Sequence, residues 1–380
     1  MNGIFIINDP SFLEKNSGIG KKINNQVKIF NDNGLICKTV LQKSGREKMP
    51  NFLGKAIFLL PFSNVSPKWE WKEEYQHIDF IYVRRPVAMS FSMRSFLKKC
   101  KKNNPKLKIF LEIPTYPYDG EFEKGLKQIL LWRDRYNRTK LQGLVDRVFV
   151  IDPSEQITDF YGAPATVFLN GYDVKNCKVR TYKEHGNRII LTCVGMFNFW
   201  HGYERLIYGL YEYYKKGGNE SIYIEMVGSG KELNYYKRLA IDLQLKQFVN
   251  FYGVLYGDDL EEVYNRTDIA FSSLGRYKNN ITIVGDLKTR EYLAKGIPTV
   301  SGCTVDLFKN SNDCPFYLEV ENNNKPIDME LIVSFYYQIQ MKRSSHSIEQ
   351  ELHNYALNTY DTSTTLVPVI SSMIKDLKNN

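Results

Sequence analysis

Two charged side chains that could hold a nucleotide lie near the start of a short predicted helix, in the stretch DLKTREYLAKGIP at residues 286–298. A helix N-terminus carries partial positive charge from unpaired N–H groups, so Lys288 placed there suits a phosphate. Glu291, one turn later, can accept two hydrogen bonds from vicinal hydroxyls such as those of a ribose. The alternative is a surface pair of Lys288 with Glu291, worth about a few tenths of a kcal/mol.

Glycine-containing turns follow three predicted strands, in SGIGKK (17–22), VGMFNFWHG (194–202) and VGSGKEL (227–233). Glycine allows the backbone to approach a ligand closely. The first turn also opens a helix and carries Lys21 and Lys22, which makes it suitable for an anion. It is not G-x-G-x-x-G, and no acidic residue ends a strand about 20 positions later, so a nicotinamide site is disfavoured. A purely structural turn remains the alternative for each motif.

The elements that must position these residues alternate between apolar strands and helices, which predicts parallel sheets covered on both faces. The predicted strands are residues 3–7, 35–41, 55–62, 79–84, 108–113 and 147–152, and then 187–195, 222–228, 248–253, 268–273 and 297–302. We therefore expect an α/β protein of two tandem Rossmann-like, doubly wound domains, residues 1–178 and 179–361. The C-terminal helix, about residues 362–380, is expected to pack back on the first domain. Ligands bind beyond strand C-termini, so a central cleft between the sheets is the expected site.

Composition limits the class of protein. The chain has 380 residues, 43% of them hydrophobic, and a formal charge of +9, which favours an anionic partner. Its six cysteines form no C-x-x-C pair, and Cys37 and Cys193 lie in apolar runs, so we expect buried reduced thiols. The N-terminus lacks a basic region before its apolar run, and no apolar run reaches 18 residues. We expect a cytoplasmic protein, with peripheral attachment at the inner face of the plasma membrane as a further expectation.

Several motifs together resemble glycosyltransferase family 4, whose members have the GT-B fold. In the second half they are VGMFNFWHGYERLIYGL, EMVGSGKELNYYKRLA, VNFYG, TDIAFSSLGRYKNN and LKTREYLAKGIP; in the first half they are SGIGKK, LEIPTYPYDGE, VDRVFVID and LNGYDV. The resemblance covers nearly the whole chain. It implies that Glu291 holds the ribose of a nucleotide-sugar donor and that Lys288 lies against the diphosphate.

The same resemblance implies two further sets of site residues. The donor set is Gly195, Asn198, His201, Gly228, Gly230, Tyr252, Gly253, Lys278, Lys288 and Glu291, with Arg276 as a weaker candidate. The acceptor-side set is Ser17, Gly18, Gly20, Lys21 and Tyr116. No metal site and no cofactor are expected, because no Asp-x-Asp turn ends a strand.

This sequence departs from the family pattern at three places. Met196 and His201 stand where the family usually has an Arg and a Lys, and Ile283 stands in place of the first glutamate of its E-x7-E pair. The histidine customary in the first domain is also missing. His201 is either a protonated phosphate contact or a packing residue. No catalytic residue is assigned; Glu112, Asp119 and His201 are the candidates.

The resemblance implies a retaining, metal-independent transfer of a sugar from a nucleoside-diphosphate donor to a glycan or lipid-linked acceptor, in the synthesis of a bacterial capsular, exopolysaccharide or other surface glycan. One alternative is a degenerate protein that binds a nucleotide sugar or a partner without turnover, and another is a nucleotide-sugar epimerase. Residues 80–111 hold nine Lys or Arg and no acid, which suits an anionic membrane surface or is simply a solvated face. Nucleic acid is not expected as a partner, because no recognised binding module is present.

Overall fold

The computed structural model describes residues 1–13, 18–42, 69–122, 127–154, 157–309, 314–343 and 347–379. The chain divides into unit 1, Met1–Gly171 with Thr362–Asn380, and unit 2, Tyr172–Asp361. The division comes before residue 178, because the backbone at Tyr172 pairs with Asp361 and the Asp361 carboxylate accepts hydrogen bonds from the N–H groups of Val174 and Lys175, both at 3.2 Å. These contacts tie residues 172–175 to unit 2.

Unit 1 is built on a sheet that has seven strands within the described residues, in the order β2-β1-β3-β4-β5-β7-β6. All neighbours are parallel except β6 and β7. The strands are β1 (Asn2–Ile7), β2 (Ile36–Leu41), β3 (Phe80–Arg84), β4 (Lys108–Ile113), β5 (Arg147–Val150), β6 (Asp159–Phe160) and β7 (Ala163–Val167). The predicted strand at 55–62 lies outside the described residues.

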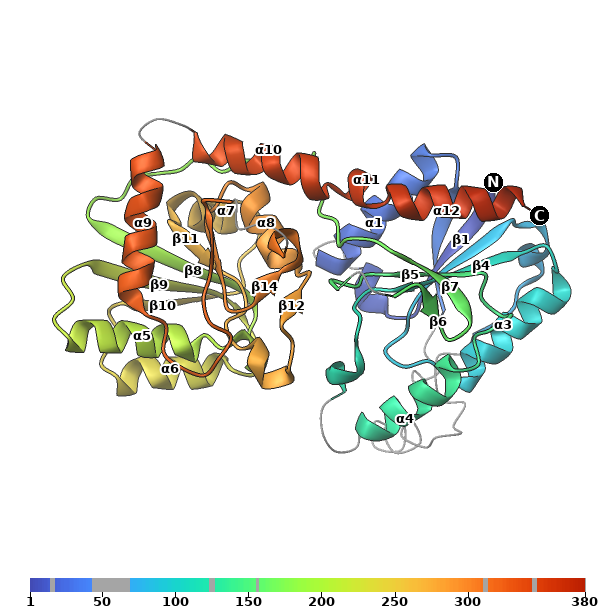
Figure 1. The fold of residues 1–380 in the computed structure, drawn as a ribbon, viewed down its shortest axis with the longest axis horizontal. Helices are drawn as coiled ribbons and strands as arrows, with labels where there is room; N and C mark the ends of the chain where they lie inside the picture. The colour runs from blue at the N-terminus through green and yellow to red at the C-terminus, as the bar shows by residue number, and fades with distance from the viewer. Residues whose placement is uncertain are drawn as a thin grey trace. The chain divides into compact units, whose positions relative to one another are not determined.

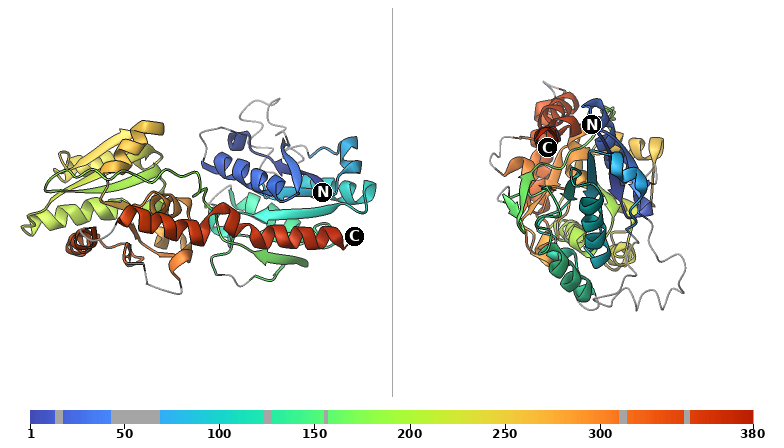
Figure 2. Two further views of the ribbon diagram at one scale, coloured as in Figure 1. Left: turned by 90° about the horizontal axis from the view of Figure 1, so that it is seen from above. Right: turned by 90° about the vertical axis from the view of Figure 1, so that its right-hand side faces the viewer.

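Helices cover both faces of this sheet (Figure 1). On one face, α1 (Gly18–Asp32) and α12 (Val367–Lys378) share a core with Phe5 and Ile7; on the other, α3 (Phe91–Asn103) and α4 (Lys127–Arg138) share a core with Ile4 and Ile6. The strand residues alternate because successive side chains point to opposite faces. The C-terminal helix therefore lies on unit 1, and both chain ends are neighbours there (Figure 2).

Unit 2 holds a parallel sheet that has six strands among the described residues, in the order β10-β9-β8-β11-β13-β15. They are β8 (Arg188–Met196), β9 (Ser221–Ser229), β10 (Val249–Gly253), β11 (Ile269–Phe271), β13 (Thr299–Ser301) and β15 (Tyr317–Glu319); β12 (Ile283–Val284) pairs separately with β14 (Thr304–Val305). The helices are α5 (Glu204–Lys215), α6 (Leu233–Asp242), α7 (Gly257–Arg266), α8 (Leu287–Ala294), α9 (Met329–Arg343) and α10 (Ile348–Tyr360), with α11 (Thr362–Thr365) in unit 1.

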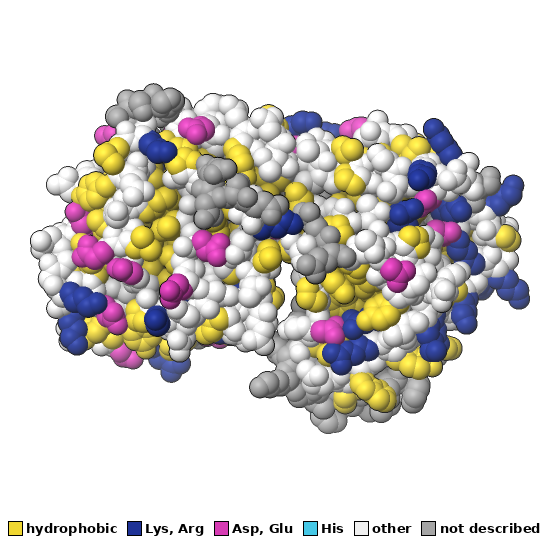
Figure 3. Space-filling view, viewed as in Figure 1, with side chains coloured by type: hydrophobic (Ala, Val, Ile, Leu, Met, Phe, Trp, Pro, Cys, Tyr) yellow, Lys and Arg dark blue, Asp and Glu magenta, His cyan; other side chains and the backbone are white. Residues whose placement is uncertain are grey.

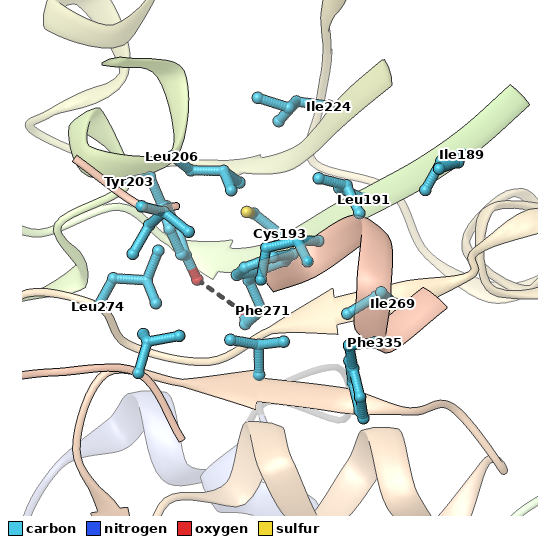
Figure 4. Packing of buried hydrophobic residues seen from close by; sticks show 14 of the residues in the cluster. Ile189, Leu191, Cys193, Tyr203, Leu206, Ile224, Ile269, Phe271, Leu274 and Phe335 are labelled. Carbon is cyan, nitrogen blue, oxygen red and sulfur yellow. Dashed lines mark hydrogen bonds between the residues drawn. The ribbon is translucent and has the colours of Figure 1, made fainter. Parts of the chain in front are cut away.

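The core of unit 2 packs strand residues such as Leu191, Cys193 and Phe271 against the helices, and the Tyr203 hydroxyl donates to the Phe271 carbonyl at 3.2 Å (Figure 4). Cys37 and Cys193 are buried and all six cysteines are free thiols, as predicted. Burial raises the pKa of the Cys193 thiol well above its usual range, which keeps it protonated and inert. Among the described residues, no helix is long and apolar enough to cross a membrane.

Candidate functional site

Helix α8 is anchored over the end of β8 by residues that lie far apart in the sequence. The Tyr292 hydroxyl accepts from the Val194 N–H at 3.1 Å, and the Tyr360 hydroxyl donates to the Arg290 carbonyl at 2.9 Å. Arg290 is fully buried and donates to both oxygens of Asp306, at 2.9 and 2.8 Å. Of the charges crowded into the first turns of α8, Arg290 is therefore a structural one.

Lys288 lies against the end of β8. Its ammonium donates to the Tyr203 hydroxyl at 3.1 Å, and a Cβ placed on Gly195 would lie 2.9 Å from Nζ. Burial lowers the pKa of Lys288 to about 8, although the nearby Asp286 carboxylate opposes this shift. An ammonium held at a helix N-terminus in this way is short of anionic charge, and a phosphate would supply it.

Glu291 is held by a different partner. Its carboxylate accepts from the buried Tyr264 hydroxyl at 3.1 Å. The pKa of the Tyr172 hydroxyl is raised mainly by burial, and the negative charge of Glu291 raises it further. Glu291 also acts on Lys288, since its negative charge raises the pKa of that ammonium, but its hydrogen bond goes to Tyr264. One consequence concerns mutagenesis, because removing Glu291 would leave the Tyr264 hydroxyl without this acceptor.

Three glycines, at the ends of β8 and β9 and just after β9, lie where an added side chain would collide with neighbouring atoms. Gly195 pairs with Gly228 in register, and a Cβ on Gly228 would lie 1.9 Å from the Gly195 carbonyl oxygen. A Cβ on Gly230 would lie 2.3 Å from the carbonyl oxygen of Phe197. All three glycines have positive φ, between 137° and 145°. Their packing explains why these positions are glycine, and the bare backbone they create lies directly beside Lys288.

The turn after β8 is built by Asn198 and His201. The His201 Nδ1 accepts from the Asn198 N–H at 2.9 Å, while the His201 N–H donates back to the Asn198 carbonyl at 2.9 Å. Burial, with the positive charges of Lys288 and Arg276, lowers the pKa of His201 to about 2. His201 is therefore neutral, with its proton on Nε2, and its ring stacks on that of Tyr203, which favours the packing alternative over a protonated phosphate contact.

The remaining donor candidates are distributed around this edge. Lys278 is paired with the Glu204 carboxylate, and the Arg276 guanidinium lies 6.0 Å from the Trp200 ring centre. The Tyr252 hydroxyl donates to Glu225 at 3.0 Å, and Gly253 pairs with Val227, next to Gly228. The ends of β8, β9 and β10 and the start of α8 thus form one edge of the sheet, which we call the α8 edge.

Asp286 was missed by sequence reasoning. It precedes α8 at the N-cap position, where an aspartate normally accepts a backbone N–H, yet its side chain makes no cap hydrogen bond. One carboxylate oxygen accepts from the Ser272 hydroxyl, and the other is buried with no partner among the described residues. Ile283, where the family pattern has a glutamate, lies on β12. The only sequence signal at Asp286 was the preference for aspartate at a helix N-cap, which predicts a capping role and no role in a binding site.

On unit 1, α1 begins at Gly18, and Ser17 lies outside the described residues. Gly20 is buried and Lys21 is exposed. Tyr116 packs edge-on against Phe160, with ring centres 6.2 Å apart, and burial raises the pKa of its hydroxyl. These residues stay acceptor-side predictions.

Glu112 and Asp119 have structural partners that remove them from the list of catalytic candidates. Glu112 is fully buried, pairs with Arg84, and accepts at 2.8 Å from both the Tyr82 hydroxyl and the Gln26 amide. Burial alone would raise its pKa, but Arg84, Lys22 and these hydrogen bonds hold that pKa below its usual range. A carboxylate locked in this way cannot exchange a proton readily near neutral pH.

Asp119 is held in the same manner by two guanidinium groups. It accepts from Arg135 at 2.7 Å and from Arg138 at 2.6 Å. Partial burial would raise its pKa, and the hydrogen bonds from Arg138 and Arg135 outweigh that effect and lower it. Both acids that sequence reasoning left as candidates in EIPTYPYDGE are therefore ion-pair partners; the side chain of Glu121 lies outside the described residues.

Solved structures share this architecture. A sucrose-phosphate synthase from Thermosynechococcus elongatus matches over all of both chains, with a TM-score of 0.67 and 10% identity. A glycosyltransferase from Rickettsia africae ESF-5 matches over all of this chain and 99% of its own, with a TM-score of 0.63 and 13% identity. The Anabaena protein HepE, solved in complex with UDP, matches over 99% of this chain and all of its own, with a TM-score of 0.61 and 12% identity.

No protein-family model matches this sequence, and no curated protein matches it either. At identities this low the structural matches show the fold alone. That fold is GT-B, two Rossmann-like domains in tandem, so the predicted fold class is confirmed.

Proposed function

We propose that the protein is a glycosyltransferase whose unit 2 binds a nucleoside-diphosphate sugar at the α8 edge. The observation that carries the proposal is the Lys288 ammonium, held at the start of α8 against Gly195 and the Tyr203 hydroxyl. Burial has lowered its pKa to about 8, so the site gains from a bound anion. The HepE structures, which include complexes with UDP and with UDP-glucose, make UDP the first nucleotide to test.

Each part of the donor has a proposed partner. The diphosphate lies against Lys288 and the first N–H groups of α8, over the bare backbone of Gly195 and Gly228. The ribose hydroxyls donate to Glu291, whose carboxylate the Tyr264 hydroxyl already orients. Neutral His201 contributes a hydrogen-bond donor through Nε2. Lys278 must break its ion pair with Glu204 before it can contact a phosphate. Lys288 therefore supplies most of the positive charge that the family obtains from the Arg and Lys replaced here by Met196 and His201.

The proposed reaction proceeds with retention and needs no metal ion. The bond between the sugar C1 and the diphosphate oxygen breaks, and Lys288 with the α8 N–H groups stabilises the charge on the leaving diphosphate. The acceptor hydroxyl forms a new bond to C1 from the same face, and its proton passes to the leaving phosphate. No protein base is required in this scheme. Among the described residues, no group of three or more His, Cys, Asp or Glu has metal-site geometry.

The acceptor is proposed on the resemblance alone. It is a glycan or a lipid-linked sugar, and the product is a bacterial capsular, exopolysaccharide or other surface glycan made in the cytoplasm. Gly18, Gly20, Lys21 and Tyr116 of unit 1 are the proposed acceptor-side residues.

The test is calorimetric titration of the purified protein with UDP and UDP-glucose, followed by GDP, ADP, TDP and their sugars. Glu291→Gln keeps an oxygen for the Tyr264 hydroxyl while removing the charge, and should weaken nucleotide binding by about tenfold or more. Glu262→Gln is the matched control, because Glu262 lies on the exposed face of α7 and pairs only with Lys183 among its described ion-pair partners. Equal affinity of both variants would remove Glu291 from the site.

Turnover separates the proposal from its alternatives. Release of the free nucleotide from a bound sugar nucleotide, stimulated by an acceptor extract, supports transfer. Tight binding with no release supports the degenerate protein that the departures at Met196 and Ile283 suggest. Conversion of one nucleotide sugar into another, without release, would support an epimerase. No binding of any nucleotide would overturn the proposal.

A further inference from the structure

Large hydrophobic side chains are exposed together on one part of unit 1. Trp132 and Tyr136 lie four residues apart on α4 with 70% and 54% of their surface exposed, and Phe91, the first residue of α3, is 52% exposed. Val87, in the segment that leads into α3, is 64% exposed. Residues four apart share one face of a helix, so Trp132 and Tyr136 point the same way. Exposed apolar side chains that gather in this manner mark an interaction surface.

Basic side chains tie these aromatic rings together. The Arg94 guanidinium lies 5.3 Å from the Phe91 ring centre and 5.5 Å from that of Tyr136, and so it joins α3 to α4. The Lys140 ammonium lies 5.2 Å from the same Tyr136 ring. Figure 3 shows hydrophobic and basic side chains next to one another over this part of unit 1. We call the surface made by Val87, Phe91, Arg94, Lys98, Trp132, Tyr136 and Lys140 the α3–α4 face.

The α3–α4 face carries the cations Arg94, Lys98 and Lys140, and the neighbouring acids whose side chains the structure describes are already engaged. No acid occurs in residues 80–111, where Lys98 is exposed one turn beyond Arg94. The acid of α4, Asp134, is buried and accepts from the Met89 N–H and the Tyr118 hydroxyl, both at 2.8 Å. Asp119 is held by Arg135 and Arg138. These acids therefore do not neutralise the positive charge of this face.

We infer that the α3–α4 face docks on an anionic lipid bilayer. Exposed tryptophan and tyrosine beside arginine and lysine suit the boundary between headgroups and acyl chains, where each ring buries its apolar body and keeps its polar edge wet. Lys98, Arg94 and Lys140 attract anionic headgroups. Val87 has no ring to stack on a base or a sugar, and it gains only from an apolar medium such as the bilayer interior.

The inference does not depend on the proposed reaction, because the α8 edge belongs to unit 2 and the α3–α4 face to unit 1. A failure of nucleotide binding would leave vesicle binding as predicted, and a failure of vesicle binding would leave donor binding as proposed. Membrane docking would favour a lipid-linked sugar over a free glycan as the proposed acceptor, since an enzyme held on a membrane meets lipid-linked sugars.

The test is sedimentation of the full chain with vesicles of phosphatidylcholine alone and of phosphatidylcholine with 30% phosphatidylglycerol, a composition of roughly the anionic content that supports such attraction. Binding to the anionic vesicles, and release by salt, are expected. Lys98→Gln should weaken binding about fivefold and Trp132→Ser about tenfold. Lys216→Gln on the exposed end of α5 and Ile241→Ser, 59% exposed on α6, are the matched controls in unit 2 and should bind as the wild type does.

Fluorescence gives a second measurement on the same samples. The difference in emission between the wild type and Trp132→Phe reports Trp132 alone, and it should shift to shorter wavelength when anionic vesicles are added. Equal binding to neutral vesicles, unchanged binding by both face variants, or an unshifted Trp132 signal on bound protein would each overturn the inference. If the Trp132 emission responds to a soluble glycan and not to vesicles, the partner of the α3–α4 face is a glycan and the inference of a bilayer is wrong.

Discussion

Replacing Lys288 with methionine should stabilise the free protein and weaken nucleotide binding at the same time. The folded chain holds this ammonium where burial lowers its pKa from 10.5 to about 8. Its charged form is therefore disfavoured by folding, and methionine fills the same volume without a charge. The Tyr203 hydroxyl keeps its hydrogen bond to the Phe271 carbonyl after the change, so no buried donor is left unpaired.

The magnitude follows from the pKa. A shift of one pKa unit corresponds to about 1.4 kcal/mol, so the cost of holding Lys288 charged at pH 7 is at most about 3 kcal/mol. The side chain is partly exposed, and we therefore expect Lys288→Met to raise the free energy of unfolding by about 1–3 kcal/mol. Loss of one charged hydrogen bond to a phosphate should weaken UDP binding by roughly 10- to 150-fold.

The pH dependence has a definite sign. Between pH 8 and 10.5 the unfolded chain keeps the Lys288 proton while the folded chain has lost it, so the stability of the wild type rises relative to the variant. The advantage of Lys288→Met should be full below pH 8 and shrink toward pH 10.

The assay is urea unfolding at pH 7, 8 and 9.5, paired with UDP titration at pH 7. Lys216→Met is the control, because its side chain is 78% exposed and should change neither quantity. A Lys288→Met variant that is less stable than the wild type at pH 7, and that binds UDP equally well, would refute both the burial argument and the phosphate site.

Three further outcomes are expected. Glu112→Ala leaves the Arg84 charge unpaired in the core and should lower the free energy of unfolding by about 3–5 kcal/mol in urea; a stable but inactive variant would restore Glu112 as a catalytic acid. Asp306→Asn weakens the buried pair with Arg290 and should lower the melting temperature of unit 2, measured by calorimetry, whereas an unchanged transition would contradict the anchoring of α8. The affinity for UDP-glucose should stay level between pH 5.5 and 7.5, because the pKa of His201 is about 2; tighter binding on acidification would show that this histidine titrates.

Much of the fold was predictable because short-range patterns determine it. Apolar runs predicted β1 to β5 in unit 1 and β8 to β11 and β13 in unit 2, whereas β6, β7 and β15 were not predicted. The GT-B fold class followed from the order of motifs. The start of unit 2 was less certain, since the pairing of Tyr172 with Asp361 joins residues almost 190 positions apart.

The candidate site was predictable in part. The position of Lys288 at the start of α8 was predicted from the helix-forming residues around it. The glycine turns nearby were predicted from the ends of the apolar strands. The state of His201 was not predicted, because its low pKa depends on burial and on cations contributed by other loops. Asp286 was missed because its carboxylate points to Ser272 and does not cap the helix.

The sequence by itself determined most of the strands and helices, where glycine is needed, and which charged residues meet at the beginning of α8. The tertiary structure decided what each of those charges does. Arg290 became an anchor because α8 packs against Asp306, and Glu112 became an ion-pair partner because β3 and β4 lie side by side. Lys288 lies against bare backbone at Gly195, 93 residues earlier on β8, which leaves its charge for the proposed phosphate. The physical reason is that a charged side chain takes its role from the partners and the solvent exposure that long-range packing gives it.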